Sequence, residues 1–287
     1  MDEDTVGALF VFCSAAGFAT LGIFGKLAAA AGLSIPTVLF FRFLLASLLF
    51  WGVLAARGEA TILRGRALAV GVLLGGGGYA AMSSLYFLGL EYMTAGLVGI
   101  LLYTYPAFVI LIAVLALDEP VTGRTVAALA LSLAGVALIT GADPAAASGV
   151  GVAIMLAAAL VYAGYITASR QVLGSVDAPT LTAHVLPAAA VTFLLIGTGT
   201  GSLQVPVGVE SWSSIAGIAV VATAVPIFTF FAGIARVGAS RASILSTVEP
   251  AITVALGALV LQEQVTVWTV VGGALVLGGV LLVQQRR

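Results

Sequence analysis

The chain is short of charge, of cysteine and of histidine. Only 8% of its 287 residues are charged, whereas 61% are hydrophobic and the mean hydropathy is +1.21. In a soluble domain roughly a quarter of the residues are charged. This chain has too few charged residues to form a water-soluble surface. Because each helix needs about 20 mostly apolar residues to cross the hydrocarbon, we expect an all-α membrane protein with about ten spans.

The rare reactive residues exclude several kinds of chemistry. Cys13 is the only cysteine, so neither a disulfide nor a thiolate metal site can form within one chain. The single histidine, His184, cannot build a metal site, and Gly75–Gly78 lacks the Lys-Ser/Thr of a phosphate-binding loop. The net charge of −1 argues against a nucleic-acid partner. We therefore expect no cofactor, no metal, no nucleic acid and no enzymatic activity.

Breaks at charged, glycine and proline positions divide the apolar sequence into ten predicted helices. The connections between them are short, so neighbouring helices must run antiparallel. The predicted helices are 6–31, 34–56, 67–90, 93–117, 124–141, 149–170, 179–200, 211–236, 240–262 and 266–284.

The sequence repeats itself after 144 residues. The segment 89–119, GLEYMTAGLVGILLYTYPAFVILIAVLALDE, aligns with 233–263, GIARVGASRASILSTVEPAITVALGALVLQE. In both, the proline follows the first glycine by 17 positions and the last glutamate follows the proline by 13. We therefore divide the chain into two units, 1–143 and 144–287. Two copies of one membrane module form the scaffold of many transporters, with a substrate site where they meet.

The basic residues predict an orientation. With the N-terminus in the cytoplasm, nine of the eleven lie at cytoplasmic ends of helices, while Lys26 lies at an outer end and Arg42 inside a span. This is a strong positive-inside bias, so both termini are predicted to be cytoplasmic. Since each unit has five spans, the second must be inserted upside down. The Glu119 turn then lies inside and the Glu263 turn outside.

The segment SLYFLGLEYMTAGLVGILLYTYPAFVILIAVLALDEPVTGRTVAALALSLAGVALI resembles the EamA domain of the drug/metabolite transporter superfamily. The second copy shares the pattern through TVEPAITVALGALVLQE, and PTVLFFRFLLASLLF is similar to the family's second helix with its embedded arginine. The resemblance implies ten helices in two inverted five-helix repeats. It also implies a central cavity lined mainly by helices 1, 3, 4, 6, 8 and 9, with helices 5 and 10 packed together at the periphery.

Aromatic side chains predict the substrate site. Trp51, Trp212 and Trp268 lie at span ends, where they fit an interfacial belt. Six tyrosines lie well inside spans, where a hydroxyl facing lipid would have no partner, so they face other helices or a wet cavity. The candidate substrate-binding residues are Tyr79, Met82, Tyr86, Tyr103, Tyr105, Tyr162, Tyr165 and Glu249. Tyr103 and Tyr105 cannot point the same way on one helix, so one of them would only pack.

Three charged side chains are expected within spans. Glu249, near the middle of helix 9, could bind a substrate amine, exchange a proton or have a structural role at a proline kink. Arg42 could pair with a carboxylate or reach toward the interface, and a structural role is favoured. Lys26 is expected to reach toward the outer interface.

Glycine and other small residues predict close helix packing or flexibility, and prolines predict hinges. Gly75–Gly78 is expected to make helix 3 flexible beside the cavity, and small residues on helices 5 and 10 allow close approach. Pro106, Pro226 and Pro250 lie in mid-span and are candidate hinges.

A cavity rich in tyrosine and poor in charge fits a partly apolar solute with a polar end. Similarity within the family favours bacterial inner-membrane exporters of amino acids or related metabolites, aromatic amino acids first, working by alternating access. The expected partners are this small-molecule substrate and the lipid bilayer, with the protein a monomer or weak homodimer. The alternatives are a nucleotide-sugar or organophosphate antiporter, which would need several basic residues at the cavity, and a membrane regulatory partner or intramembrane enzyme.

Overall fold

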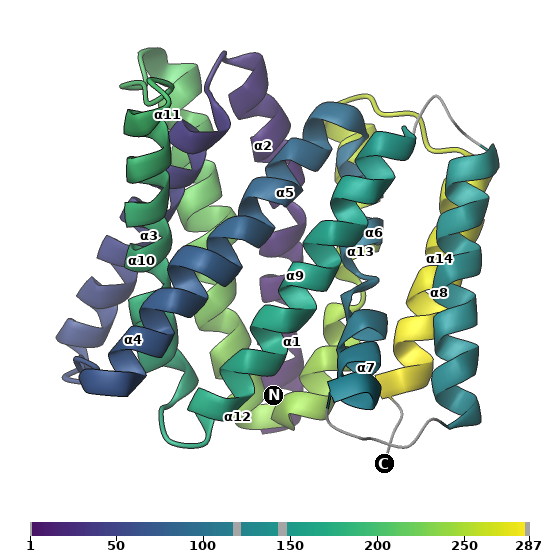
Figure 1. Ribbon diagram of the computed structural model, residues 1–287, viewed down its shortest axis with the longest axis horizontal. Coiled ribbons are helices and arrows are strands. Elements are labelled where there is room, and N and C mark those ends of the chain that lie inside the picture. Colours follow the sequence, from purple (N-terminus) through teal and green to yellow (C-terminus); the bar gives the residue numbers. More distant parts are fainter. Residues whose placement is uncertain (1, 117–121, 143–147, 285–287) are drawn as a thin grey trace.

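The computed structural model describes residues 2–116, 122–142 and 148–284, and these residues form a bundle of upright helices (Figure 1). The described part of the chain contains helices and no strand. In the first half the elements are α1 (Glu3–Ala19), α2 (Leu21–Ala30), α3 (Ile35–Ala56), α4 (Gly65–Leu73), the π-helical segment η1 (Leu74–Tyr79), α5 (Ala80–Tyr92), α6 (Ala95–Leu102), α7 (Tyr105–Ala116) and α8 (Gly123–Ala142). In the second half they are α9 (Gly149–Leu173), α10 (Ala178–Gly199), α11 (Gly208–Ala216), the π-helical segment η2 (Gly217–Ala224), α12 (Val225–Ser246), α13 (Glu249–Val260) and α14 (Val267–Gln284).

These elements combine into the ten apolar helices expected from the sequence. Eight are long and apolar enough to cross a membrane, and two further apolar helices are shorter, at Val126–Gly141 and Val267–Leu282. A helix rises 1.5 Å per residue and a bilayer core is about 30 Å thick, so the apolar runs set the span lengths. The protein is a multi-pass, all-α membrane protein, as predicted.

Capping side chains fix where several spans begin. The side chains of Ser34, Thr94, Ser148 and Asp177 each accept a hydrogen bond from the backbone N–H three residues further on. The backbone N–H groups in the first turn of a helix have no partner within the helix, and lipid cannot supply one. Each capping bond satisfies one of these groups.

Several spans are interrupted, and the interruptions follow the 144-residue offset. The π-helical segments η1 and η2 lie at corresponding places in spans 3 and 8. The α-helix also stops at 103–104, between α6 and α7, and at 247–248, between α12 and α13. At Gly238 a φ of 78° separates span 8 from span 9. The α-helix is therefore interrupted at corresponding places in both halves. Repeats that contain discontinuous membrane helices show this pattern.

Glycine contacts between the halves follow the same offset. On α8, Gly135 lies against the backbone of Gly272 on α14, and on α14, Gly279 lies against the backbone of Ala128 on α8. Positions 128 and 272 correspond, as do 135 and 279, so this contact is nearly symmetric about a two-fold axis. Helices 5 and 10 thus pack together at the periphery, as the resemblance implied (Figure 1).

A second pair of contacts obeys the same symmetry. Gly7 on α1 faces Val237 on α12, and Gly151 on α9 faces Met93, just after α5. Positions 7 and 151 correspond, as do 93 and 237. These contacts support 1–143 and 144–287 as the proposed units. The Glu119 turn lies outside the described residues.

The glycine contact between α8 and α14 gives a stability prediction with its own control. A Cβ at Gly279 would lie 2.7 Å from the Ala128 carbonyl oxygen, whereas a Cβ at the neighbouring Gly278 meets nothing within 4 Å. Gly279→Leu is therefore expected to destabilise the protein by about 1–3 kcal/mol, and Gly278→Leu to leave it unchanged. The thermal unfolding midpoint of the detergent-purified protein tests this. Equal midpoints for the two variants would contradict the packing.

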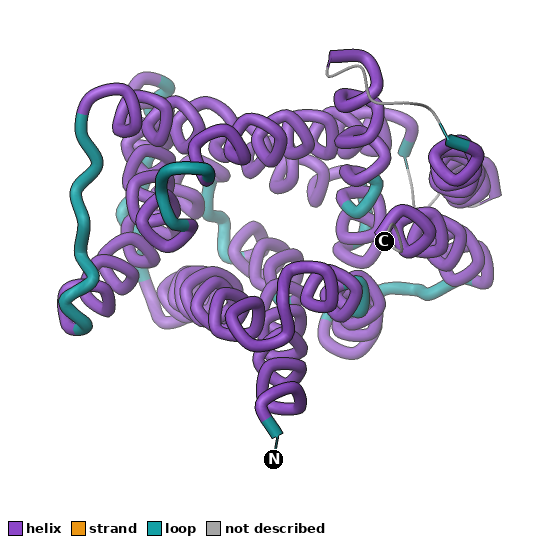
Figure 2. Tube along the Cα trace, turned by 90° about the horizontal axis from the view of Figure 1, so that it is seen from below, coloured by secondary structure: helices purple, strands orange, loops and turns teal. Residues whose placement is uncertain are grey.

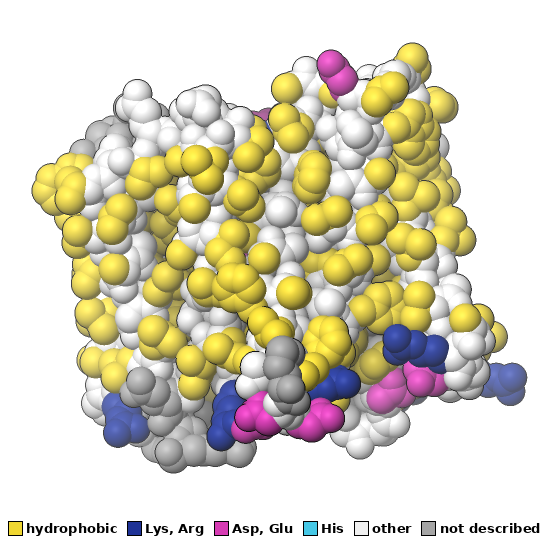
Figure 3. All heavy atoms as spheres, turned by 180° about the vertical axis from the view of Figure 1, so that it is seen from behind, with side chains coloured by type: hydrophobic (Ala, Val, Ile, Leu, Met, Phe, Trp, Pro, Cys, Tyr) yellow, Lys and Arg dark blue, Asp and Glu magenta, His cyan; other side chains and the backbone are white. Residues whose placement is uncertain are grey.

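The surface separates an apolar belt from a charged end. In Figure 3 hydrophobic side chains cover the height of the bundle, and most of the Lys, Arg, Asp and Glu side chains in view gather at the lower edge. This is the end at which α1 begins and α14 ends (Figure 1). Viewed from that end, the helices surround a central region (Figure 2).

Candidate functional site

A cavity of about 300 Å³ lies between the helices of the two halves. Its wall draws on nearly every span except helices 5 and 10. The lining residues are Phe18, Leu21, Arg42, Tyr79, Met82, Ser83, Tyr86, Gly99, Leu102, Tyr103, Tyr105, Tyr162, Tyr165, Thr182, Val185, Leu186, Ile227, Phe230, Phe231, Ser246, Glu249 and Thr253. The wall is therefore mostly apolar and aromatic, with a small number of polar groups, as in small-molecule sites generally.

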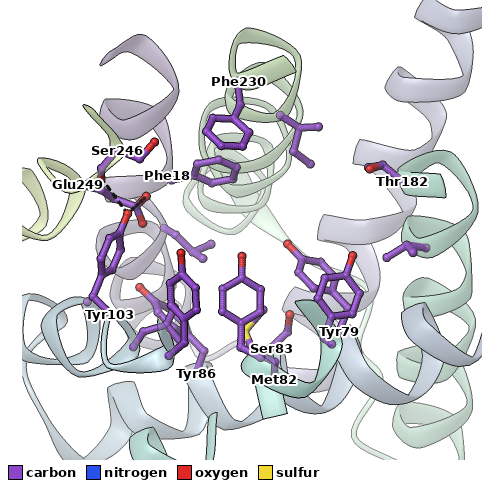
Figure 4. A pocket seen from close by; sticks show the side chains of 18 of the residues that line it. Phe18, Tyr79, Met82, Ser83, Tyr86, Tyr103, Thr182, Phe230, Ser246 and Glu249 are labelled. Atoms are coloured by element: carbon purple, nitrogen blue, oxygen red, sulfur yellow. Dashed lines mark hydrogen bonds between the residues drawn. The ribbon is translucent and has the colours of Figure 1, made fainter. Parts of the chain in front are cut away.

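The structure brings all eight predicted substrate-binding residues onto this one wall, where Figure 4 shows several of them. These residues are Tyr79, Met82, Tyr86, Tyr103, Tyr105, Tyr162, Tyr165 and Glu249. Their role in binding stays a prediction, since a shared wall does not by itself identify a ligand.

Glu249 lies at the start of a half-helix inside the bundle. It is the first residue of α13, directly after the break at 247–248, whereas the sequence placed it within an uninterrupted helix. A helix N-terminus carries a partial positive charge that stabilises a carboxylate. The Tyr103 hydroxyl lies 2.9 Å from Glu249 Oε2 and 2.9 Å from the Ser246 carbonyl oxygen (Figure 4). The Glu249 carboxylate is thus held at the cavity wall by both halves of the chain.

Four tyrosines form a continuous aromatic wall. The rings of Tyr105 and Tyr162 meet edge to face at 4.9 Å, and Tyr162 stacks on Tyr165 at 6.1 Å. Tyr165 in turn lies 5.4 Å from Tyr79. These centroid distances are those of favourable aromatic pairs. The result is a rigid apolar surface with phenol groups.

The expectation that either Tyr103 or Tyr105 would only pack is wrong, because both line the cavity. The expectation assumed one continuous helix, on which residues two apart point in different directions. The helix instead stops after Leu102 and begins again at Tyr105. The break changes the direction of the chain and lets both rings face the same space.

The three candidate hinge prolines share a local setting. Pro106, Pro226 and Pro250 are each the second residue of a helix, α7, α12 and α13. A proline in the first turn of a helix lacks an N–H that would have no partner there anyway. Pro106 and Pro250 therefore follow breaks between half-helices, whereas Pro226 lies where the π-helical η2 passes directly into α12 within one span. Hinge motion at these places stays a prediction.

The glycines of η1 have a packing role. Gly75 lies against Val185 and Ala188 of α10, and Gly78 faces the ring of Tyr165. A side chain at Gly75 would push α10 away, whereas a Cβ at Gly78 would be in ordinary contact with Tyr165. The sequence suggested flexibility, whereas the structure shows close packing beside the cavity.

Sequence reasoning missed two helices of the cavity wall. Helix 7 was not expected there, yet Thr182, Val185 and Leu186 of α10 line it, as does Arg42 of helix 2. Arg42 is 2% exposed and makes no ion pair within the described part of the chain. Its Nε donates to Thr223 Oγ1 at 3.0 Å instead. Among the described residues Arg42 has no carboxylate partner, and its buried side chain does not reach the interface. The sequence had suggested one or the other.

Trp51, near the end of α3, contacts α10. Its Nε1 donates to the Ala183 carbonyl oxygen at 2.7 Å, and its ring meets His184 edge to face. His184 Nε2 accepts from the Leu63 backbone N–H at 3.1 Å. Trp51 and His184 thus join α3, α10 and the loop before α4, and both have structural partners.

The half-helices α6 and α13 pack together in the part of the bundle away from the N-terminus (Figure 1). Gly96 packs on Val254 and Gly99 on Thr253. The Glu263 carboxylate accepts hydrogen bonds from the backbone N–H groups of Ala95 at 2.7 Å and of Gly96. A carboxylate at the positive end of a helix is stabilising, so Glu263 fastens α6 to the end of span 9.

The corresponding interface at the other end is arranged differently. The counterpart of α13 is α7, which packs on α9 and makes no comparable contact with the end of α12 among the described residues. Two exposed ion pairs lie at this end, Arg236 with Glu3 at 3.3 Å and Arg241 with Asp4 at 3.0 Å. Exposed ion pairs contribute little to stability. Although α1 and α12 pack closely at this end, α7 and the end of α12 therefore lack, within the described part of the chain, the contact that α13 and α6 make at the Glu263 end.

A bundle of interrupted apolar helices around a central cavity defines a polytopic membrane transport protein. The chain matches the EamA-like transporter family over residues 5–141 and again over 149–284, and it belongs to that family, part of the drug/metabolite transporter superfamily. The two matches correspond to the two halves of the repeat. The protein is a membrane transporter.

Several relatives are similar over most of the chain. The uncharacterised transporter YcbK of Bacillus subtilis (strain 168) is 28% identical over 98% of this chain and 92% of its own length. An uncharacterised transporter of Archaeoglobus fulgidus is 30% identical over 69% of this chain and 70% of its own. A crystal structure of a protein 19% identical superposes with a TM-score of 0.67 over 97% of this chain and 96% of the other. That likeness supports the fold alone.

Proposed function

We propose that this transporter exports small metabolites, most of all amino acids with aromatic or other hydrophobic side chains, by alternating access at the central cavity. The observation that carries the proposal is the wall itself, where an aromatic surface stands beside one carboxylate, Glu249, and one guanidinium, Arg42. An apolar surface with few oriented polar groups suits a solute with a hydrophobic side chain and a charged end.

The size of the cavity favours a small solute. Its volume of about 300 Å³ is at the lower end of the roughly 300–1,000 Å³ of small-molecule pockets. This volume suits a single amino acid better than a nucleotide sugar. Tyr105, Tyr162 and Tyr165 offer ring faces and edges to an aromatic side chain.

Glu249 is the proposed partner of the substrate's amine. It is the only carboxylate on the cavity wall, among the described residues. Tyr103 and the start of α13 hold it in place. A charged hydrogen bond from an ammonium group in a partly apolar cavity is strong, so Glu249 would favour substrates that carry an amine.

The alternatives fit the cavity less well. Phosphorylated sugars and nucleotide sugars carry two or more negative charges, and such anions are bound by several basic groups. Arg42 is the only basic side chain on the described wall, and Glu249 would repel them. A regulatory partner or an intramembrane enzyme would need an interaction surface or a catalytic set, and no observation favours either.

The proposed setting is a bacterial inner membrane, with both termini in the cytoplasm and the protein a monomer or weak homodimer. The orientation rests on the basic residues, which gather at the end where α1 begins (Figure 3). On this assignment the Glu263 end, where α6 packs on α13, faces outward.

Release of preloaded solute from proteoliposomes tests the function. Vesicles that contain the protein should release phenylalanine or tryptophan faster than vesicles without it, and faster than they release glucose 6-phosphate. The aromatic preference would be wrong if a broad amino-acid panel left at equal rates. Amino-acid export would be wrong if the phosphorylated sugar left faster.

A further inference from the structure

Arg42 carries a buried charge that no residue of the described chain neutralises. The side chain is 2% exposed, and the described residues form two ion pairs, neither of which includes it. An unpaired charge inside a membrane protein is costly and indicates a function. The charge therefore requires an explanation beyond helix packing.

The contacts of Arg42 orient the guanidinium without neutralising it. Its Nε donates to Thr223 Oγ1 at 3.0 Å, and the guanidinium carbon lies 4.7 Å from the Phe43 ring centroid. Thr223 is itself fixed in η2, because its hydroxyl donates to the Ile218 carbonyl oxygen at 2.8 Å. Thr223 and Phe43 are both uncharged. The guanidinium is thus held on the cavity wall with its charge available.

Polar groups on helix 3 surround the same part of the cavity. Tyr79 and Tyr86 line the same cavity as Arg42. Ser83, one turn from each of them, is 1% exposed, and its Oγ has no hydrogen-bond partner among the described residues. Figure 4 shows these side chains along one edge of the cavity. A buried hydroxyl without a partner costs free energy unless a ligand satisfies it.

We propose that Arg42 binds the carboxylate of the transported solute, with Ser83 and Tyr86 as neighbouring hydrogen-bond groups. A guanidinium presents its N–H donors in a planar fork that matches a carboxylate. Arg42 and Glu249 face one cavity without forming an ion pair, so each remains available for an opposite charge on the ligand. The proposal rests on the proposed function and adds the group that selects the acid end of the substrate.

Three phenyl compounds test the assignment by equilibrium binding to the purified full-length protein. Phenylalanine has both charged groups, 3-phenylpropionate lacks the amine, and 2-phenylethylamine lacks the carboxylate. The unmodified protein should bind 2-phenylethylamine at least roughly tenfold more weakly than phenylalanine, since the amine alone lacks the charged hydrogen bonds to Arg42. Equal binding of these two would overturn the proposal without any variant.

Variants separate ligand binding from folding. Arg42→Gln should weaken both carboxylate ligands by roughly 10- to 100-fold and leave 2-phenylethylamine unchanged, an outcome that a purely structural role would not give. Arg42→Lys, which keeps the charge but lacks the fork, should weaken them less and serves if the glutamine variant does not fold. The matched control is Arg66→Gln, at an exposed arginine outside the cavity, which should change nothing.

The outcomes distinguish this proposal from the proposed function. If phenylalanine binds equally to the unmodified protein and to Arg42→Gln, the role of Arg42 is wrong while amino-acid transport stands. If only 3-phenylpropionate binds, and Arg42→Gln weakens its binding, the carboxylate site is supported and amino-acid export is contradicted. If neither carboxylate binds the unmodified protein, both are overturned.

Discussion

Glu249→Gln is expected to reduce phenylalanine efflux from proteoliposomes by at least roughly tenfold, because the charged hydrogen bond to the substrate amine contributes about 1.5–3 kcal/mol. Glutamine has nearly the same shape and can still accept from Tyr103, so the start of α13 should keep its place. The change therefore removes the charge and little else. The matched control is Glu210→Gln, at an exposed position on α11, which should leave efflux unchanged.

The same ligand series shows whether the loss concerns the amine. Binding of phenylalanine and 2-phenylethylamine should weaken in Glu249→Gln, while binding of 3-phenylpropionate should not. Arg42→Gln is expected to give the opposite selectivity. A Glu249→Gln variant that exported phenylalanine at the normal rate would show that the carboxylate at the start of α13 is not needed for the substrate.

The span count and the family were predictable because they depend on long-range composition. A bilayer core of about 30 Å forces each apolar run to nearly the same length, and the prolines at 106 and 250 lie in recognisable copies of one segment. The position of each tyrosine within a span followed from these runs. A phenol at that depth must face protein or water, which brought six tyrosines to the predicted site.

The interruptions could not be predicted in the same way. Nothing in the local periodicity of GILLYTYPAF distinguishes a helix that stops after Leu102 from one that continues to Ala116. Proline is tolerated within membrane helices as well as at their starts. The break decides where Tyr103, Tyr105 and Glu249 point, so the geometry of the site depended on a feature that the sequence pattern does not encode.

The surroundings of Arg42 were also beyond sequence reasoning. The arginine was recognisable as a charge inside a span, but its hydrogen-bond acceptor, Thr223, is 181 residues away. The packing of α10 against the glycines of η1 likewise brings Thr182 and Val185 to the wall. Such contacts follow from how the two units dock, which one sequence without its structure does not specify.

Gly96→Cys combined with Val254→Cys is expected to lock the transporter with its Glu263 end closed. A Cβ at Gly96 would lie 3.5 Å from the Val254 Cβ, within the roughly 3.5–4.5 Å that a disulfide requires. The two positions belong to different units, on α6 and α13. In a background where the exposed Cys13 is replaced by alanine, oxidation should join them and stop efflux, and a reducing agent should restore it.

The repeat predicts a second lock for the opposite state. The contact of Gly99 with Thr253 at the Glu263 end corresponds, after the 144-residue offset, to Ser243 with Val109 at the other. These positions lie on α12 and α7, which lack a comparable contact among the described residues. If the α6–α13 contact opens while the corresponding contact between α12 and α7 forms during transport, Ser243→Cys with Val109→Cys should crosslink during turnover, and more slowly when the Glu263 end is locked.

Single-cysteine variants at the four positions control for the substitutions themselves. Alternating access between the proposed units requires each disulfide to stop transport, because each would hold one end shut throughout the cycle. A Gly96→Cys, Val254→Cys protein that was fully crosslinked and still released phenylalanine at the normal rate would show that the contact between α6 and α13 never opens. The solute would then have to leave by a path that does not separate the two units.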